Sequence, residues 1–196
     1  MRDKNKRKNE ILTAAANLFA QKGYERTTIK DVTGAIGLNQ GIFYYYFPDK
    51  QTLLYSAMDS GLQSILPKAR QIAKMKTSPV AKLELLIKTH LAPFIINKAV
   101  PTIATNEMRN LSAKMRKKYL AVRDAYEAIF REVINAGIAA GQFREVDVPL
   151  MSAFILGLLN SVIPWYRSDG RYSPDEIAVQ LVDFILPALK KEERRG

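Results

Sequence analysis

Apolar residues recur every three or four positions along most of the chain, and no segment alternates strictly between apolar and polar residues. The longest apolar stripe lies on one face of a helix predicted from Ser112 to about Ala139, and it consists of Met115, Tyr119, Val122, Tyr126, Ile129, Phe130, Val133 and Ile134. Turn signals interrupt the pattern near residues 77–79, 99–101, 110–112, 141–149 and 168–174. We therefore predict an all-α protein of about nine helices.

A segment in the first quarter of the chain carries capping residues at helical spacing. Thr28 can cap a helix that begins at Ile29, and Asp31 can complete a capping box with Thr28. Val32 and Ile36 then fall on the same side of this helix as Ile29, so the sequence predicts a short amphipathic helix here.

A glycine turn and a second short helix follow this amphipathic helix. Gly37 supplies the backbone freedom for a tight turn, and Asn39 can cap a helix from about Gln40 to Tyr46. Two such helices joined by a glycine turn are the layout of a helix-turn-helix motif. We therefore predict that the second helix offers its outer side to the major groove of DNA.

The residues that open the second helix are the predicted base readers, because that end typically enters the groove: Asn39, Gln40, Gly41 and Ile42. The Gln40 amide can form a bidentate pair with adenine, and Gly41 lets the backbone approach closely. Ile42 can either lie against a thymine methyl group or pack in the core. The other aromatic residues of this helix are expected to close a small core against Leu18 and Phe19, and they are Phe43, Tyr46 and Phe47.

Phosphate contacts are expected from five further residues around the motif. Thr28 and Lys30 can donate to phosphate at the start of the first short helix, although capping alone also accounts for Thr28. Tyr44 and Tyr45 carry phenolic hydroxyls on the outer side of the second helix. Lys50 opens the next helix, where its ammonium and the free amides can hold one phosphate together.

Basic residues also precede the first predicted helix, and they are Arg2, Lys4, Lys6, Arg7 and Lys8. They are consistent either with a flexible arm that contacts phosphates or the minor groove, or with a solvated, disordered end. The whole chain has a formal net charge of +11, which favours polyanionic partners. It contains no cysteine, which excludes a disulfide scaffold, a thiolate zinc site and cysteine catalysis.

The length of 196 residues allows two compact units. We predict a helix-turn-helix domain over residues 1–48 and a helical effector-binding and dimerisation domain over residues 49–196. The N-terminus lacks the apolar run of a secretory signal, so we expect a cytoplasmic protein. The most apolar segment, Val148 to Pro164, is shorter than a membrane span of about 20 residues, so we predict a buried helix and no membrane partner.

The last two predicted helices are apolar over most of their surface. One contains Leu150, Phe154, Ile155, Leu158, Leu159 and Val162, and the other contains Ile177, Leu181, Val182, Phe184, Ile185 and Leu189. Ala153, Gly157 and Ser161 form a row of small residues that would let another helix approach closely. A four-helix bundle in a homodimer explains this pattern, and a wholly intramolecular core is the alternative.

The N-terminal quarter resembles the TetR family of repressors, at Ile11, Ala15, Ala16, Leu18, Phe19, Gly23, Tyr24, Thr28, Gly37, Gly41, Tyr44, Phe47 and Lys50. Thr33 departs from the family pattern, in which alanine is usual, and Gly34 adds backbone freedom within the helix. The resemblance implies a repressor that binds a palindromic double-stranded DNA operator as a dimer. It also implies an effector cavity, for which the candidate lining residues are Leu91, Phe94, Met108, Tyr119, Tyr126, Phe130 and Phe154.

The C-terminal half is similar to the TetR-family regulators that sense acyl-CoA thioesters and control fatty-acid or sterol degradation. The matching residues include Trp165, Tyr166, Arg167, Gly170, Ser173 and Pro174. The resemblance implies an acyl-CoA or related fatty effector that releases the repressor. Basic side chains could attract the CoA phosphates, or they could be ordinary solvent-facing charges: Arg109, Lys114, Arg116 and Arg123.

Other functions make different demands on the sequence. A multidrug-sensing repressor of an efflux gene would need an acid in the pocket, such as Glu107, Asp124 or Glu127. An architectural DNA binder would make little use of a second domain. A hydrolase or transferase would need a nucleophile, a base and an orienting group within reach, and no such set is visible. We predict no catalytic residue, metal or cofactor, a structural role for His90, and a protein that is not an enzyme.

Overall fold

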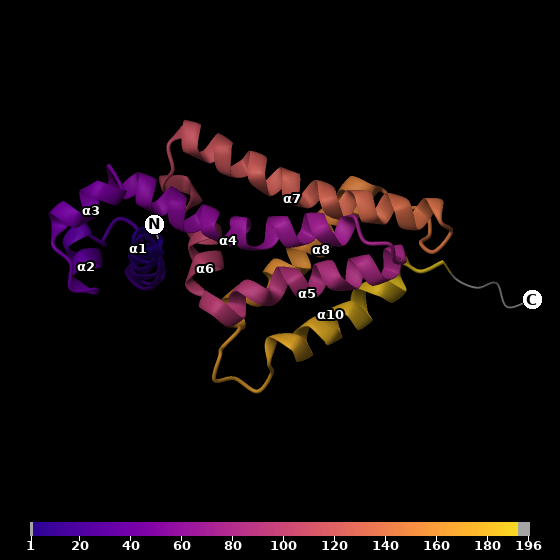
Figure 1. Cartoon of the computed structure of the whole chain (residues 1–196). Coiled ribbons are helices and arrows are strands. Elements are labelled where there is room, and N and C mark those ends of the chain that lie inside the picture. The colour runs from indigo at the N-terminus through magenta and orange to yellow at the C-terminus, as the bar shows by residue number, and fades with distance from the viewer. Residues whose placement is uncertain (1, 192–196) are drawn as a thin grey trace, which may run out of the picture. The chain divides into compact units, whose positions relative to one another are not determined.

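The computed structural model describes residues 2–191, apart from the side chains of residues 2, 3 and 94–96. Within that range the chain forms ten α-helices and one 3-10 helix: α1 (Arg2–Lys22), α2 (Ile29–Gly34), α3 (Gln40–Tyr46), α4 (Lys50–Ala73), α5 (Pro79–Asn97), α6 (Ala99–Asn106), η1 (Met108–Asn110), α7 (Ala113–Ala139), α8 (Val148–Asn160), α9 (Val162–Trp165) and α10 (Pro174–Leu189) (Figure 1). Nine of the α-helices have six residues or more, so the prediction of an all-α protein with about nine helices is confirmed.

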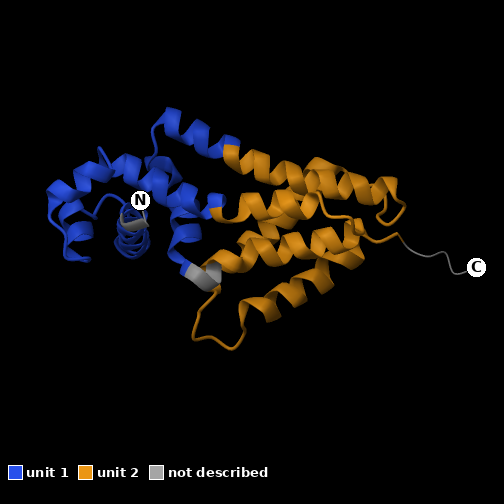
Figure 2. Cartoon of the chain, viewed as in Figure 1, with its two compact units in different colours: residues 1–63, 97–121 blue, residues 64–96, 122–196 orange. Residues whose placement is uncertain are grey.

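The chain divides into two compact units (Figure 2). Unit 1 contains residues 1–63 and 97–121, and unit 2 contains residues 64–96 and 122–196. This division differs from the expected boundary between residues 48 and 49. The physical reason is that the first part of α4, all of α6 and the start of α7 contribute apolar side chains to the core of the helix-turn-helix unit.

The core of unit 1 is a single hydrophobic cluster around the helix-turn-helix motif. Its central side chains are almost fully buried and come from α1 to α4, and they include Ile11, Phe19, Val32, Phe43, Phe47, Leu53 and Met58. Ile103 from α6 and Tyr119 from α7 are buried in the same cluster. The short helices α2 and α3 are therefore held by packing, since helices of six or seven residues are not stable alone.

The core of unit 2 is built from one face of each of its long helices. The buried side chains are apolar and recur at helical spacing, as in Leu83, Leu86 and Ile87 of α5, Phe130, Val133 and Ile134 of α7, Ile155 and Leu159 of α8, and Ile185 and Leu189 of α10. A second small cluster joins Leu91 to Val162, Ile163, Tyr166, Ile177 and Ala178. The predicted stripe of the long helix is thus a core stripe at most of its positions.

Several prolines lie inside helices, and one of them follows an expected boundary between two helices. Pro67 and Pro93 fall within α4 and α5, as predicted from the uninterrupted helical pattern around them. The break expected near residues 99–101 lies at Lys98, between α5 and α6, and Pro101 falls in the first turn of α6. A proline is tolerated there because the amide hydrogens of the first turn have no partner within the helix.

The apolar stretch Val148–Trp165, which contains α8 and α9, is more exposed than predicted. It is long and apolar enough to cross a membrane by length and composition, with a mean hydropathy of 1.6, but only 28% of it is buried. Leu150, Phe154 and Trp165 are each at least half exposed. The prediction of a buried helix is therefore wrong for one side of this segment, and that side needs a covering surface.

Candidate DNA-binding site

The start of α2 is fixed by the predicted capping box. The Thr28 amide donates to Asp31 Oδ2 at 2.8 Å, and the Asp31 amide donates to Thr28 Oγ1 at 3.1 Å. The Thr28 hydroxyl also donates to Asp31 Oδ2 at 2.9 Å. We expected this hydroxyl proton to be available to DNA, and the structure corrects that expectation. These hydrogen bonds lower the pKa of Asp31, so the cap is ionised at neutral pH.

The turn between α2 and α3 has the predicted geometry. Gly37 has a φ of +65°, a left-handed conformation that favours glycine. The Leu38 amide donates a hydrogen bond to the Thr33 carbonyl at 2.8 Å, and this bond closes the turn. Asn39 then caps α3, because its Oδ1 accepts from the Ile42 amide at 3.0 Å. This cap fixes the start of the helix that was predicted to read bases.

The helix α3 has one buried face and one exposed face. Phe43 and Phe47 lie in the core of unit 1 with no more than 2% of their surface exposed, and Tyr46 packs against that core. On the other face, Gln40 and Gly41 are exposed, together with Ile42 at 37%, Tyr44 at 54% and Tyr45 at 67%. Because Ile42 is not in the core, a role in contacting a thymine methyl group remains open to it. Large apolar and aromatic groups exposed together on a short helix indicate a contact surface.

The basic N-terminus is helical rather than a flexible arm, because α1 already begins at Arg2. Lys4 Nζ lies 4.7 Å from the centroid of the Tyr45 ring, and Lys8 Nζ lies 5.9 Å from that of Phe47. A hydrogen bond with Tyr45 raises the pKa of Lys4, which keeps this ammonium charged. The sequence signal for this contact was the spacing of Lys4 and Lys8, which places them on one face of α1.

The start of α4 is less open to phosphate than expected. The Thr52 amide already donates to Asp49 Oδ1 at 2.6 Å, so one of the predicted free amides has a partner. Lys50 Nζ lies 4.1 Å from the centroid of the Tyr24 ring and donates to the Glu25 carbonyl at 3.4 Å. Lys50 would have to exchange this carbonyl for a phosphate oxygen on binding DNA. Lys30, in contrast, is exposed near the start of α2.

The candidate effector residues do not form one group. Leu91, Tyr126 and Phe130 are buried in unit 2, whereas Met108 and Tyr119 pack in the core of unit 1. Phe154 is 61% exposed on α8, which corrects its assignment as a lining residue, because it lies on the uncovered side of that helix. The side chain of Phe94 lies outside the described residues.

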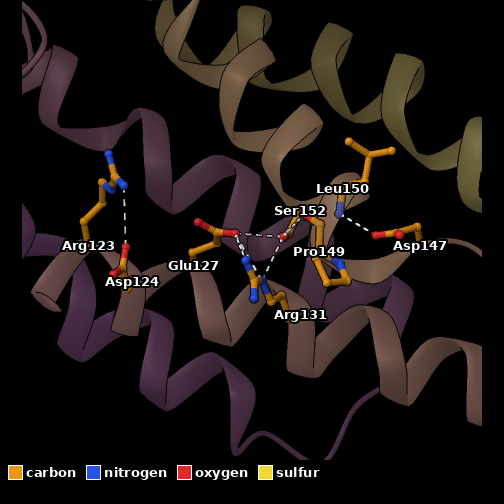
Figure 3. A network of polar contacts seen from close by, with 8 residues as sticks. All are labelled: Arg123, Asp124, Glu127, Arg131, Asp147, Pro149, Leu150 and Ser152. Carbon is orange, nitrogen blue, oxygen red and sulfur yellow. Dashed lines mark hydrogen bonds and ion pairs between the residues drawn. The ribbon is translucent and has the colours of Figure 1, made fainter. Parts of the chain in front are cut away.

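Each of the three acids considered as the pocket acid of a cation sensor has a partner. Glu107 is buried in unit 1 and accepts from Asn110 Nδ2 at 2.6 Å. Glu127 is paired with Arg131 on α7 and also accepts from the buried Ser152 hydroxyl of α8 at 3.1 Å (Figure 3).

Asp124 is exposed, and its carboxylate lies 3.6 Å from the Arg123 guanidinium. Among the described residues, no group of three or more His, Cys, Asp or Glu side chains is placed to hold a metal ion.

The fold and the exposed face of α3 define a class, namely helix-turn-helix DNA-binding regulators with a second helical unit. Residues 11–57 match the family model "Bacterial regulatory proteins, tetR family", and residues 76–189 match "Tetracyclin repressor-like, C-terminal domain". The chain belongs to the TetR family. It is therefore a transcriptional regulator and not an enzyme, as the sequence predicted.

Relatives along the whole chain agree with this assignment. The HTH-type transcriptional repressor KstR2 of Rhodococcus jostii (strain RHA1) is 29% identical over 188 residues, covering 95% of this chain and 92% of KstR2. The fatty acid metabolism regulator protein of Bacillus subtilis (strain 168) is 22% identical over 191 residues, covering 96% of this chain and 98% of the regulator. The crystal structure of the TetR family transcriptional regulator PfmR from Thermus thermophilus has a TM-score of 0.85 and 32% identity, covering 92% of this chain and 99% of PfmR.

Proposed function

We propose that this protein is a cytoplasmic, ligand-responsive transcriptional repressor that binds a palindromic operator as a homodimer. The observation that carries the proposal is the exposed face of α3, where Gln40, Ile42, Tyr44 and Tyr45 project from a helix whose other face is buried. Gln40 and Ile42 read base edges in the major groove, while Tyr44, Tyr45 and Lys30 contact the sugar-phosphate backbone. Lys4, stacked on Tyr45, adds a second positive charge beside this helix.

The exposed sides of α8 and α10 support the homodimer. Leu150 and Phe154 of α8 are 50% and 61% exposed, and Val179 and Phe184 of α10 are 46% and 71% exposed. The small residues Ala153, Gly157 and Ser161 are exposed on the same side of α8 as Phe154. A second copy covers these helices in a two-fold four-helix bundle. Two copies of α3 then reach half-sites about 34 to 36 Å apart, or a multiple of that distance.

The proposed effector is an acyl-CoA or a related fatty molecule. One relative is named as a fatty acid metabolism regulator, which supports a fatty effector for this chain. Effector binding favours a dimer geometry in which the two recognition helices no longer match the operator spacing. The helices α4 and α7 can carry this change, because each is continuous from unit 1 into unit 2.

A multidrug sensor of cations is less well supported. Such a sensor needs an acid without a partner, since a buried ammonium ion is costly unless it is paired. Glu127 is paired with Arg131, Asp124 is exposed beside Arg123, and Glu107 lies in unit 1. The acids considered for this role therefore either have a cationic partner or belong to unit 1.

The test is fluorescence anisotropy with labelled DNA from upstream of the protein's own gene. The full-length protein is titrated at a fixed moderate salt concentration, and palmitoyl-CoA is then added to the complex. Saturable binding followed by release supports an acyl-CoA-responsive repressor. Binding without release refutes the effector, and equal affinity for unrelated DNA of the same length refutes operator recognition.

A further inference from the structure

A cluster of basic side chains lies on η1 and the first two turns of α7, outside the helices that were expected to contact DNA. All of its members are exposed, and we call them the basic cluster: Arg109, Lys114, Arg116, Lys117 and Lys118. The sequence contains no acidic residue between Glu107 and Asp124. Among the described residues, no member of the basic cluster takes part in an ion pair. The cluster is therefore a concentrated positive charge that is not neutralised within this part of the chain.

The basic cluster is unfavourable for α7 itself. The N-terminal end of a helix carries a partial positive charge, so acids are stabilising there and cations are not, yet the first turn of α7 contains no acid. Lys114, Lys117 and Lys118 are three and four residues apart, which places three like charges side by side on one face. A local preference that is broken without a compensating contact indicates a functional requirement. An anionic partner would supply the counter-charge.

The basic cluster belongs to the unit that carries the reading helix. Tyr119 is buried in the core of unit 1 and Met115 packs against it, so the start of α7 is fixed to this unit (Figure 2). Gln51 Nε2 donates to the Asn110 carbonyl at 3.0 Å, which joins η1 to the first turn of α4. Lys50, the candidate phosphate contact after α3, directly precedes Gln51. The basic cluster therefore continues from the place where a phosphate contact was already expected.

We propose that the basic cluster binds phosphates of the operator duplex, next to those contacted at the start of α4. The proposal rests on the proposed function and deepens it by naming a further DNA-binding surface on unit 1. Lys114 and Lys118 are one helical turn, about 5.4 Å, apart, whereas duplex DNA carries one charge per about 1.7 Å of its axis. The cluster therefore meets more than one phosphate. Such contacts add affinity and fix the orientation of the protein, but they do not read the sequence.

The phosphates of a CoA effector have the same chemistry, but the exposure of the basic cluster favours DNA. Sites for small molecules are concave and bury most of the ligand. The five side chains are instead all exposed along η1 and one helix, and they lie in unit 1. An extended row of exposed cations suits a polyanion, which meets several of them at once.

The salt dependence of DNA binding tests the proposal. Each lost phosphate contact should lower the slope of log affinity against log salt concentration by about 0.9. We expect K114Q/K117Q/K118Q to lose a slope of about 2 to 3 per bound protomer, and at least about tenfold in affinity at about 50 mM salt. The loss should occur with the upstream DNA and with an unrelated duplex, because phosphate contacts do not depend on sequence. Urea unfolding should show no loss of stability, because the variant removes repulsion within α7.

A matched control separates contact from net charge. K68Q/K74Q/K76Q removes three exposed lysines from unit 2, so the two triple variants have the same net charge. We expect this control to keep the salt slope of the wild type. A slope that is unchanged in the variant of the basic cluster, or reduced equally in the control, overturns the proposal.

A second measurement reports proximity directly. The chain contains no cysteine, so K117C provides a single attachment point for an iron–EDTA reagent that cleaves nearby DNA. We expect the K117C conjugate to cut a bound duplex, whereas the K76C conjugate, at an exposed lysine of unit 2, leaves it intact. Absence of cleavage by the K117C conjugate overturns the proposal.

The same titrations distinguish this inference from its alternatives. If coenzyme A alone binds the wild type but not K114Q/K117Q/K118Q, and the salt slope is unchanged, the cluster serves a small ligand and the proposal is wrong. If the wild type binds upstream and unrelated DNA equally, operator recognition fails. A reduced slope on both duplexes then still supports the basic cluster as a phosphate-binding surface.

Discussion

At the scale of single residues, operator recognition depends on side chains that α3 exposes and that make no contact essential to the core. Gln40 is exposed at the first position of the helix, whereas Phe43 and Phe47 are buried and anchor the helix to the core of unit 1. Substitutions on the outer face should therefore change DNA affinity with little effect on stability. Substitutions on the inner face should unfold unit 1, since truncating a buried Phe costs about 3 to 5 kcal/mol.

Gln40→Ala should weaken operator binding by about 1 to 3 kcal/mol, because a bidentate contact with a base is lost. The expected loss is specific for the operator, so affinity for unrelated DNA should change much less. Anisotropy titrations at one salt concentration measure both values. Gln71→Ala, at an exposed glutamine of α4, is the matched control and should bind like the wild type. Wild-type operator affinity of the Gln40 variant would contradict the assignment of α3.

His90 should make the stability of the protein depend on pH. Burial lowers its folded-state pKa to about 4, below the ordinary value of 6.5, so the unfolded chain binds a proton that the folded chain does not. The contribution is constant above pH 6.5, and stability is lost as the pH falls from about 6.5 towards 4. Between about pH 7.5 and 5 the loss attributable to His90 should be at most about 2 kcal/mol.

Urea unfolding gives the free energy of unfolding of the wild type and of His90→Phe at the two pH values. The change between the two pH values is larger in the wild type by the contribution of His90, because the other titrating groups contribute equally to both proteins. The phenylalanine keeps most of the ring volume but cannot titrate. An equal pH dependence in the two proteins would show that His90 is not desolvated in the folded state.

At the scale of helices, the end of α7 depends on a close contact between a helix and the loop that follows it. Gly137 is buried in α7, and a Cβ at this position would overlap the ring of Phe143, which is itself almost fully buried. Alanine is ordinarily better than glycine in a helix by about 1 kcal/mol. Here the packing decides the sign, because the Phe143 ring has no room to move within a close-packed core.

Gly137→Ala should therefore lower the free energy of unfolding by about 1 to 3 kcal/mol despite its better helix propensity. Gly34→Ala in α2 is the control, because a Cβ there meets nothing within 4 Å. It should raise the free energy of unfolding by up to about 1 kcal/mol. Chemical denaturation of both variants measures these changes, and a stabilised Gly137 variant would mean that the ring of Phe143 can rearrange freely.

At the scale of the whole molecule, function as a repressor requires two recognition helices at a fixed spacing. The exposed apolar sides of α8 and α10 are the surfaces available for this assembly. Within a single chain, a Cβ at Gly157 meets nothing within 4 Å. A larger side chain there would consequently not disturb the protomer, but it would collide with a helix of a second copy that packs closely on the row of small residues.

Gly157→Leu should convert the dimer to a monomer and weaken operator binding by at least about a hundredfold, because the second half-site no longer adds to the first. Sedimentation equilibrium and anisotropy measure the two effects, and far-UV circular dichroism should be unchanged. Ala128→Leu, at an exposed position of α7, is the control. A Gly157 variant that remains dimeric would place the dimer interface elsewhere.

The sequence by itself determined the elements and their limits, because these depend on residues close together in the chain. The capping residues Thr28 and Asn39, the turn at Gly37 and the apolar periodicity all act within one or two helical turns, and the structure confirms them. The family was also readable from the same segment, since its motif is local.

Only the tertiary structure decided which face of each helix is covered and which polar groups meet. Phe154 was indistinguishable in the sequence from its buried neighbour Ile155, yet it is exposed, because burial depends on what packs against α8. His90 meets Tyr126 and Asn160 across separations of 36 and 70 residues, which no local pattern encodes. The residue type determines whether a side chain can donate or accept a hydrogen bond, whereas the packing of whole helices determines which partner that side chain meets.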